Sequence, residues 1–179
     1  MEALVIVDMQ EVLIPMVWEG TELADRIADL ADRARAQGVR VIALQQVGGP
    51  HFERDAPGTR LAERLRLRQT DTVIQKTATD GFYRSGLAEA LHDINTIVLA
   101  GVGTDYCVDA TVRAAVSRGF DVILVEDGHS TAADPEAGLT AEQIIARHNR
   151  ILSNAVHPGG TVTVTPAEQI FRGSPRGQH

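Results

Sequence analysis

The chain has few of the residues from which a disulfide framework or a membrane anchor is built. Its 179 residues include a single cysteine, which excludes an internal disulfide. The apolar run at its start, residues 3–7, ends at Asp8 and is too short for a signal peptide or a membrane span. We therefore expect a cytoplasmic protein with no membrane partner.

Basic residues are also scarce, since 17 Lys and Arg stand against 24 Asp and Glu and the formal net charge is −7. No basic cluster with interleaved aromatics occurs, so we expect no nucleic-acid partner. The hydrophobic fraction of 44% is enough for one substantial core. We expect one domain over residues 1–172 and a flexible tail over residues 173–179, which are rich in Gly, Pro and Arg.

Short apolar runs alternate with helical patterns along the whole chain. This alternation is typical of an α/β fold with a parallel sheet covered on both faces. The expected strands are residues 3–7, 39–44, 72–75, 96–100, 121–125 and 161–164.

Two helices carry clear end signals. The first has Thr21 as its expected N-cap and ends at Gly38. A later helix opens with a capping box formed by Thr140 and Gln143. His148 lies on its inner face and is interpreted as a hydrogen-bonded core histidine.

The single cysteine follows a glycine turn between a buried strand and a helix. With Thr104 as N-cap, Cys107 occupies the third helical position, where free N–H groups and the helix dipole favour a thiolate. The thiol should then react below the pH at which a free cysteine reacts. The alternative is that Cys107 is a small buried hydrophobic residue.

Asp8, Lys76 and Cys107 each follow or end an expected strand. They meet at the carboxyl edge of the sheet if the first, third and fourth strands are central neighbours. Lys76 would then favour the thiolate, Asp8 would carry protons, and Cys107 would attack a carbonyl carbon. A structural ion pair between Asp8 and Lys76 is the alternative.

Three segments, residues 4–10, 76–82 and 101–108, closely resemble the isochorismatase-like cysteine hydrolase superfamily. The resemblance implies a three-layer α/β/α fold with a six-stranded, mainly parallel sheet. It also implies that Asp8, Lys76 and Cys107 are a catalytic triad.

The resemblance further implies a cis peptide between Val102 and Gly103. The backbone N–H groups of Gly103 and Cys107 would form an oxyanion hole, although Gly103 in a merely tight turn is the alternative. The implied reaction is amide hydrolysis through a thioester on Cys107, with ammonia or an amine leaving first and water completing the cycle.

The sequence differs from two groups within this superfamily, and each difference argues against one kind of activity. Metal-binding nicotinamidases carry Asp-x-His and a further His after the second strand, whereas residues 45–51 contain only His51. We therefore expect no zinc or iron and no other cofactor. Isochorismatases proper lack the nucleophilic cysteine, so the presence of Cys107 favours an amidase.

The expected pocket residues belong to several segments, and the loop of residues 47–60 should form part of the rim. For the aromatic residues, core packing is an equal alternative. The residues expected to shape the pocket are Gln10, Trp18, Gln46, Phe82 and Tyr106.

The sequence thus predicts a metal-independent cysteine amidohydrolase for a small amide, lactam or carbamoyl compound. Residues 138–149 resemble streptothricin hydrolases, which open a lactam, so that activity is one alternative. A nicotinamidase-like enzyme and a non-catalytic oligomeric binding or scaffold protein are the others. The resemblance also implies a homodimer or homotetramer.

Overall fold

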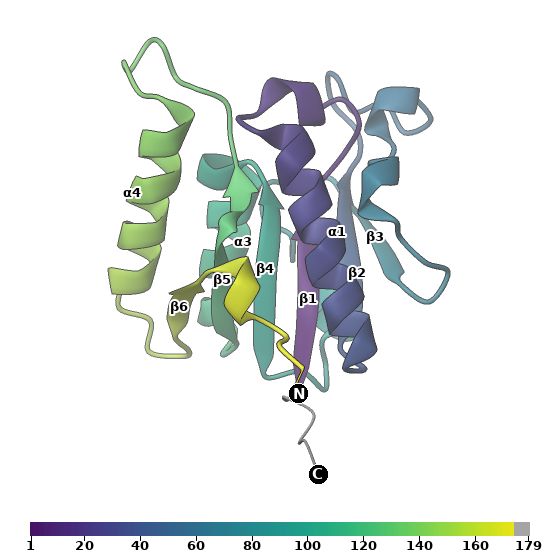
Figure 1. The fold of residues 1–179 in the computed structure, drawn as a ribbon, viewed down its shortest axis with the longest axis vertical. Coiled ribbons are helices and arrows are strands. Elements are labelled where there is room, and N and C mark those ends of the chain that lie inside the picture. Colours follow the sequence, from purple (N-terminus) through teal and green to yellow (C-terminus); the bar gives the residue numbers. More distant parts are fainter. Residues whose placement is uncertain (174–179) are drawn as a thin grey trace.

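The computed structural model describes residues 1–173, and the expected tail of residues 173–179 lies, apart from its first residue, outside the described residues. Six strands form one sheet in which every neighbouring pair is parallel (Figure 1). In chain order the strands are β1 (Glu2–Val7), β2 (Arg40–Gln46), β3 (Thr72–Lys76), β4 (Thr96–Val102), β5 (Asp121–Ser130) and β6 (Val162–Thr165). The six apolar runs therefore predicted the strands, with ends mostly within two residues. The exception is β5, which continues to Ser130 through a polar stretch.

The strand order is β3-β2-β1-β4-β5-β6. The expectation that the first, third and fourth strands are central neighbours is wrong in one respect, because β2 lies between β1 and β3. The β2 strand pairs directly with β1, as is usual for strands joined by one crossover helix. Lys76 at the end of β3 is therefore two strands away from Asp8.

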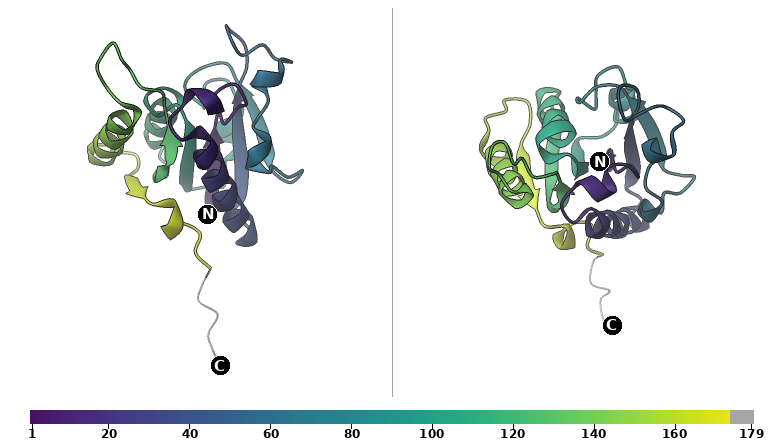
Figure 2. Two further views of the ribbon diagram at one scale, coloured as in Figure 1. Left: turned by 45° about the horizontal axis from the view of Figure 1, so that its top comes forward. Right: turned by 90° about the horizontal axis from the view of Figure 1, so that it is seen from above.

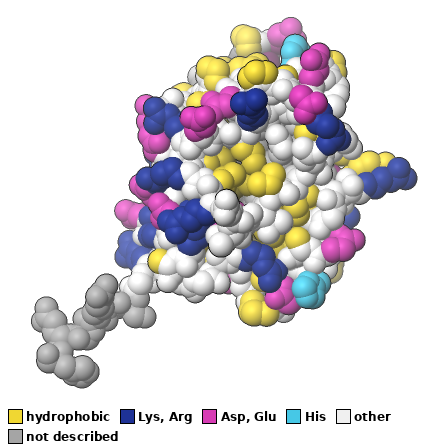
Figure 3. Space-filling view, turned by 90° about the vertical axis from the view of Figure 1, so that its right-hand side faces the viewer, with side chains coloured by type: hydrophobic (Ala, Val, Ile, Leu, Met, Phe, Trp, Pro, Cys, Tyr) yellow, Lys and Arg dark blue, Asp and Glu magenta, His cyan; other side chains and the backbone are white. Residues whose placement is uncertain are grey.

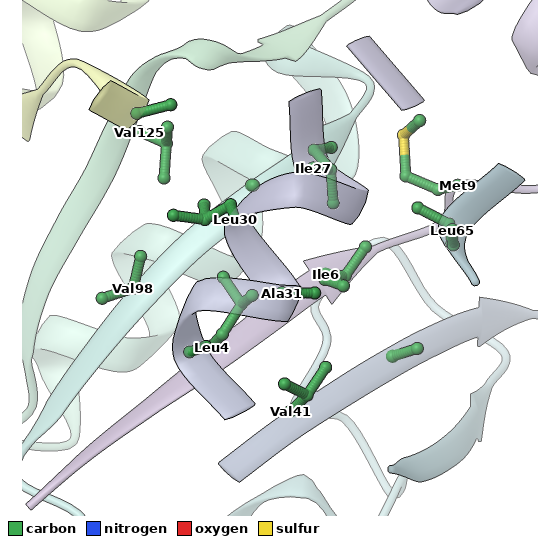
Figure 4. Close-up of a cluster of buried hydrophobic side chains, with 14 of the residues drawn as sticks. Leu4, Ile6, Met9, Ile27, Leu30, Ala31, Val41, Leu65, Val98 and Val125 are labelled. Atoms are coloured by element: carbon green, nitrogen blue, oxygen red, sulfur yellow. The ribbon is translucent and has the colours of Figure 1, made fainter. Parts of the chain in front are cut away.

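Helices cover both faces of the sheet, which makes the three layers. The helix α1 (Gly20–Ala36) lies on one face, while α2 (Leu87–Ala90), α3 (Asp109–Ser117) and α4 (Ala141–Asn154) pack on the other (Figure 2). Figure 4 shows the core under α1, where Ile27 and Leu30 lie over Leu4 and Val98 of the central strands. The central strand β1 is buried on both faces, so its run of apolar residues does not alternate.

Helix ends follow the sequence signals in part. The predicted capping box of α4 is confirmed, since the Gln143 N–H donates to Thr140 Oγ1 at 3.2 Å and the Thr140 N–H to Gln143 Oε1 at 3.0 Å. Thr21 does not cap α1, which begins one residue earlier at Gly20. A Cβ at Gly20 would lie 2.0 Å from the Ile14 oxygen, so close packing against the preceding segment sets this helix start. His148 is half-buried, and its Nδ1 lies 2.8 Å from the Ile144 oxygen.

Ion pairs fasten α1 to the chain that precedes β3. The Arg35 guanidinium binds both oxygens of Asp71, at 3.0 and 2.6 Å, and the two side chains are nearly buried. Four further pairs join arginines 64, 66 and 68 to aspartates 25, 29 and 32 of α1, and these are more exposed. Figure 3, seen from the β3 side, shows basic and acidic side chains mixed around a central hydrophobic patch. In residues 1–173 no helix is long and apolar enough to cross a membrane.

Gly101 allows β1 and β4 to approach each other closely at the carboxyl edge of the sheet. Its φ is +134°, and a Cβ there would lie 2.1 Å from the Val7 oxygen. We predict that Gly101→Ala lowers the free energy of unfolding by more than about 3 kcal/mol, because β1 and β4 would be forced apart. Gly138→Ala is the matched control, since Gly138 has φ +69° but no atom within 4 Å of its Cβ position.

The control should cost only about 1 kcal/mol, the cost of a left-handed residue. Urea unfolding of both variants measures the difference. Equal losses would show that backbone conformation alone, and not the contact with β1, requires glycine at position 101.

Candidate active site

The carboxyl edge of the sheet brings together the three residues expected to carry chemistry. Asp8 follows β1, Lys76 ends β3, and Cys107 lies in a π-helical turn, residues 104–108, that follows β4. The Lys76 ammonium nitrogen lies 2.7 Å from Asp8 Oδ2 and 3.3 Å from Cys107 Sγ. A carboxylate, an ammonium and a thiol therefore share one small site.

Lys76 reaches this site across β2. Gln46 is its register partner on that strand, and the Lys76 ammonium donates to Gln46 Oε1 at 2.7 Å and to the Ala78 oxygen at 3.0 Å. With Asp8 these make three oxygen acceptors, and Cys107 Sγ is a fourth partner for the three ammonium protons. Lys76 and Asp8 are each only 1% exposed, so their charges are met almost entirely by protein groups.

The π-helical turn, not an α-helical N-terminus, holds the cysteine. The Val108 N–H donates to the Gly103 oxygen at 3.1 Å, which gives the wide turn. Thr104 is not the N-cap, because its hydroxyl bonds to His129 and Gly103 occupies the cap position. Cys107 therefore lacks the α-helical first turn that the sequence predicted.

Burial has the largest effect on the pKa values of Cys107 and Asp8. Burial, and after it the Asp8 carboxylate, raise the pKa of Cys107 to about 12 against the opposing effect of Lys76. Burial also raises the pKa of Asp8, opposed by Lys76. The expectation of a low-pKa thiolate is wrong for this site, since desolvation and Asp8 outweigh the ammonium. The resting thiol is protonated and needs a base.

Asp8 has a free oxygen suited to that task. Its Oδ2 binds Lys76, whereas its Oδ1 is buried and has no hydrogen-bond partner within residues 1–173. Asp8 also has a positive φ of 50°, which turns the chain at the end of β1. A buried carboxylate oxygen with no donor is an acceptor for a proton.

Gly103 presents a backbone donor beside the thiol. The predicted cis peptide between Val102 and Gly103 is confirmed. The Gly103 N–H makes no hydrogen bond to another backbone group in the described part of the chain, and Gly103 lines the same cavity as Cys107. This amide is therefore available to a ligand oxygen.

A cavity of about 470 Å³ opens over Asp8 and Cys107. Its walls come from the segment after β1, from the loop after β2 and from the turn after β4. Two of the expected pocket residues, Gln46 and Tyr106, line it, and so do Gly48, Pro50 and Phe52 of the expected rim loop. The volume is in the range of sites for small molecules.

The structure places the other three expected pocket residues elsewhere. Gln10 is fully buried, and its amide donates to the Gln46 and Thr59 oxygens at 3.0 and 2.7 Å and accepts from the Gln46 N–H. It positions the rim loop and does not reach the cavity, because backbone groups use both ends of its amide. Phe82 stacks on Phe120 in the core, the alternative weighed for the aromatics.

Trp18 is 41% exposed and lies on a second cavity, of about 270 Å³, together with His129 and Ser130. Its backbone explains this placement. The Trp18 N–H donates to the Thr131 oxygen at 3.0 Å, and its own oxygen accepts from the Ser130 hydroxyl at 2.6 Å. The indole is therefore held over β5, away from Cys107.

Sequence reasoning missed a buried histidine behind the π-helical turn. His129 Nδ1 lies 2.8 Å from Thr104 Oγ1, and its Nε2 lies 2.8 Å from Asn149 Oδ1. The Asn149 amide in turn donates to the Glu126 oxygen, which fixes Nε2 as the donor and Nδ1 as the acceptor. Burial lowers the pKa of His129 to about 4, so the ring is neutral. It lies in the polar stretch that ends β5, where no apolar pattern marks a strand.

The fold and this site agree with one sequence family. The isochorismatase domain matches residues 2–163, so the chain belongs to the isochorismatase family of hydrolases. The family match confirms the resemblance noted in the sequence, and the sheet with helices on both faces confirms the expected α/β fold.

Individual relatives extend this result. A streptothricin hydrolase of Streptomyces noursei is 34% identical over 98% of this chain and 73% of its own length. A cysteine hydrolase from Pseudomonas syringae pv. phaseolicola 1448A superposes with a TM-score of 0.83 at 25% identity, covering 94% of this chain and 90% of its own. N-carbamoylsarcosine amidase from Thermoplasma acidophilum superposes with a TM-score of 0.76 at 25% identity, covering 94% and 98%.

The raised pKa of Cys107 gives a test of this geometry. We predict that alkylation of Cys107 by iodoacetamide rises with pH without a plateau up to about pH 10, beyond the value of about 8.5 for a free cysteine. Asp8→Asn should move the midpoint downward, because it removes a negative charge that disfavours the thiolate. The rate of labelling as a function of pH measures both effects.

Circular dichroism of the Asp8→Asn variant checks that it folds, and the urea-unfolded protein supplies the reference midpoint. Cys107→Ala should not be labelled, since no other cysteine exists in the chain. A midpoint below the unfolded reference would mean that Lys76 outweighs burial after all.

Proposed function

We propose that the protein is a metal-independent cysteine amidohydrolase that cleaves a small amide, lactam or carbamoyl substrate through a thioester on Cys107. One observation carries the proposal. The Lys76 ammonium holds Asp8 at 2.7 Å and Cys107 Sγ at 3.3 Å beneath a cavity open to a small molecule.

In the first step the substrate carbonyl lies over Cys107. The thiol proton moves to Oδ1 of Asp8 as Sγ forms a bond with the carbonyl carbon. A raised pKa makes Asp8 a better base than an exposed carboxylate, and the neighbouring ammonium stabilises the thiolate that develops. The nucleophile thus forms only when substrate is in place.

The carbonyl oxygen becomes an oxyanion, which accepts hydrogen bonds from the N–H groups of Gly103 and Cys107. The C–N bond then breaks, and Asp8 returns the proton to the leaving nitrogen. Ammonia or an amine departs, and an acyl thioester remains on Cys107. In a lactam the amine stays attached to the acyl group.

Water completes the cycle. Asp8, again ionised, takes a proton from a water molecule as the water oxygen attacks the thioester carbon. The C–S bond breaks, the thiolate takes the proton from Asp8, and a carboxylic acid is released. The site is then back in its starting state, with no other reactant consumed.

The relatives favour this class over its alternatives. A streptothricin hydrolase and an N-carbamoylsarcosine amidase among them support hydrolysis at a C–N bond, with opening of a lactam as the specific second candidate. A nicotinamidase-like metal centre does not fit, because residues 1–173 hold no group of three or more His, Cys, Asp or Glu side chains placed to bind a metal. A non-catalytic scaffold would not require an ammonium buried between a thiol and a carboxylate. The cytoplasmic location and the homodimer or homotetramer stay predictions.

We predict that Cys107→Ala abolishes amide hydrolysis, and that Asp8→Asn and Lys76→Met each lower kcat by about 10²-fold or more. Asp8→Asn removes the proton carrier, and Lys76→Met removes the charge that keeps Asp8 ionised. Ammonia or amine release from a panel of amides and lactams supplies the assay. Asp25→Asn, on the exposed face of α1, is the matched control for loss of a carboxylate.

Circular dichroism and thermal unfolding separate lost chemistry from lost fold. The control should retain parental turnover. A folded Asp8→Asn or Lys76→Met variant with near-parental turnover would remove that residue from the mechanism.

We also predict that turnover survives exhaustive treatment with chelators, since the site offers a thiol nucleophile and no set of metal ligands. Activity before and after chelation, followed by addition of zinc or iron, makes the measurement. Loss of turnover on chelation with recovery on adding metal would reject the metal-free mechanism.

A further inference from the structure

The cavity over Cys107 has largely apolar walls. Its larger hydrophobic and aromatic side chains come from three separate segments: Leu13, Met16, Val17, Phe52, Val102 and Tyr106. Met16 is 61% exposed and Tyr106 is 66% exposed, so the apolar surface continues to the mouth. A substrate in this cavity therefore exchanges water for hydrocarbon over much of its surface.

The cavity also lacks a free positive charge. Of the side chains that line it in the described part of the chain, only Asp8 is ionisable apart from the Cys107 thiol and the Tyr106 phenol, and none is Lys, Arg or His. The Lys76 ammonium lies beneath, but its three protons already face four acceptors: Asp8, Gln46, the Ala78 oxygen and Cys107 Sγ. It has no proton left for a carboxylate or phosphate on the substrate.

The nearest further charge is negative. Asp105 accepts a hydrogen bond at 2.6 Å from the hydroxyl of Thr131, which lines the cavity. Asp105 itself does not line the cavity. It therefore adds to the repulsion of an anion without providing a direct partner for a cation.

The polar groups that remain are neutral. Thr77 and Thr79, whose side chains carry neutral hydroxyls, line the cavity. The Gln46 amide uses its oxygen for Lys76, and its nitrogen makes only a long contact of 3.5 Å with the Val47 oxygen. Such groups can hydrogen-bond a carbonyl, hydroxyl or amide, but they cannot neutralise a charge.

We propose that this enzyme selects substrates whose acyl portion is uncharged and mostly apolar, and that it discriminates against acyl groups carrying a carboxylate or an ammonium. The inference rests on the proposed amidohydrolase function and adds the substrate class. It follows from the cost of placing a charge against the apolar wall, because the carboxylate in the lining, Asp8, is already paired with Lys76 and lies at the reacting end of the cavity.

Three primary amides of matched length test the proposal: hexanamide, the monoamide of adipic acid, and 6-aminohexanamide. They share a six-carbon acyl chain and differ in its far end, which is a methyl group, a carboxylate or a methylene that carries an ammonium. We expect kcat/KM for hexanamide to exceed that for both charged amides by about 100-fold or more. Ammonia release by the full chain gives the values.

A charge placed at the mouth should shift this preference. Met16→Arg should raise kcat/KM for the adipic monoamide, relative to hexanamide, by at least about tenfold, because it supplies a charged hydrogen-bond donor. Met16→Gln is the matched control, since it adds polarity without charge. The control should leave the ratio for the two amides close to that of the parent.

Protection of Cys107 from iodoacetamide provides a readout independent of turnover. Hexanamide should protect at a lower concentration than either charged amide. Protection or turnover with a charged amide that equals or exceeds that with hexanamide would overturn the inference while leaving the hydrolase intact. Selective protection by hexanamide, with no hydrolysis of any amide or lactam, would sink the proposed function and leave the charge selection standing.

Discussion

A lysine ammonium with almost no exposure to water persists only where a carboxylate neutralises it and oxygen acceptors bind its protons. Lys76 meets both conditions through Asp8, Gln46 and the Ala78 oxygen, at 2.7 to 3.0 Å. These three partners belong to three different segments. Losing Asp8 or Lys76 would leave the other as an unpaired buried charge, so the arrangement of the whole sheet edge depends on this ion pair.

The same burial sets the chemistry of the thiol. An exposed cysteine beside an ammonium would ionise easily, but here desolvation and the adjacent carboxylate raise the pKa of Cys107 to about 12. Reactivity therefore depends on transfer of the proton to Asp8 and not on a standing population of thiolate. A protonated resting thiol is also a weak nucleophile toward adventitious electrophiles.

Two sets of polar contacts hold the loops around this centre. Gln10 ties the end of β2 to Thr59, and so fixes both ends of the loop that carries Phe52 into the cavity wall. On the other side, a chain of hydrogen bonds runs from Thr104 through His129 to Asn149 of α4. It anchors the π-helical turn that presents Cys107. Gln10, Thr104, His129 and Asn149 do not themselves line the cavity.

Much of the fold was readable in the sequence because the strands are short apolar runs bounded by turn residues. The three chemical residues were readable because each follows such a run. The polar end of β5, with His129, was not readable, since no periodic pattern distinguishes a polar strand end from a loop. Gln10 was misplaced because two-residue periodicity gives a face of a strand but not the partner that occupies it. Trp18 and Phe82 were misplaced because their partners, the end of β5 and Phe120, lie far along the chain.

The sequence by itself determined the strand and helix content, the family and the identity of the groups at the sheet edge, because these depend on local pattern and motif. Only the tertiary structure decided that β2 separates β1 from β3, that Lys76 reaches Asp8 past Gln46, and that Cys107 is protonated at rest. Strand order and desolvation arise from contacts between segments distant in the chain. A proton affinity set by burial is therefore a property of the folded molecule and not of any motif.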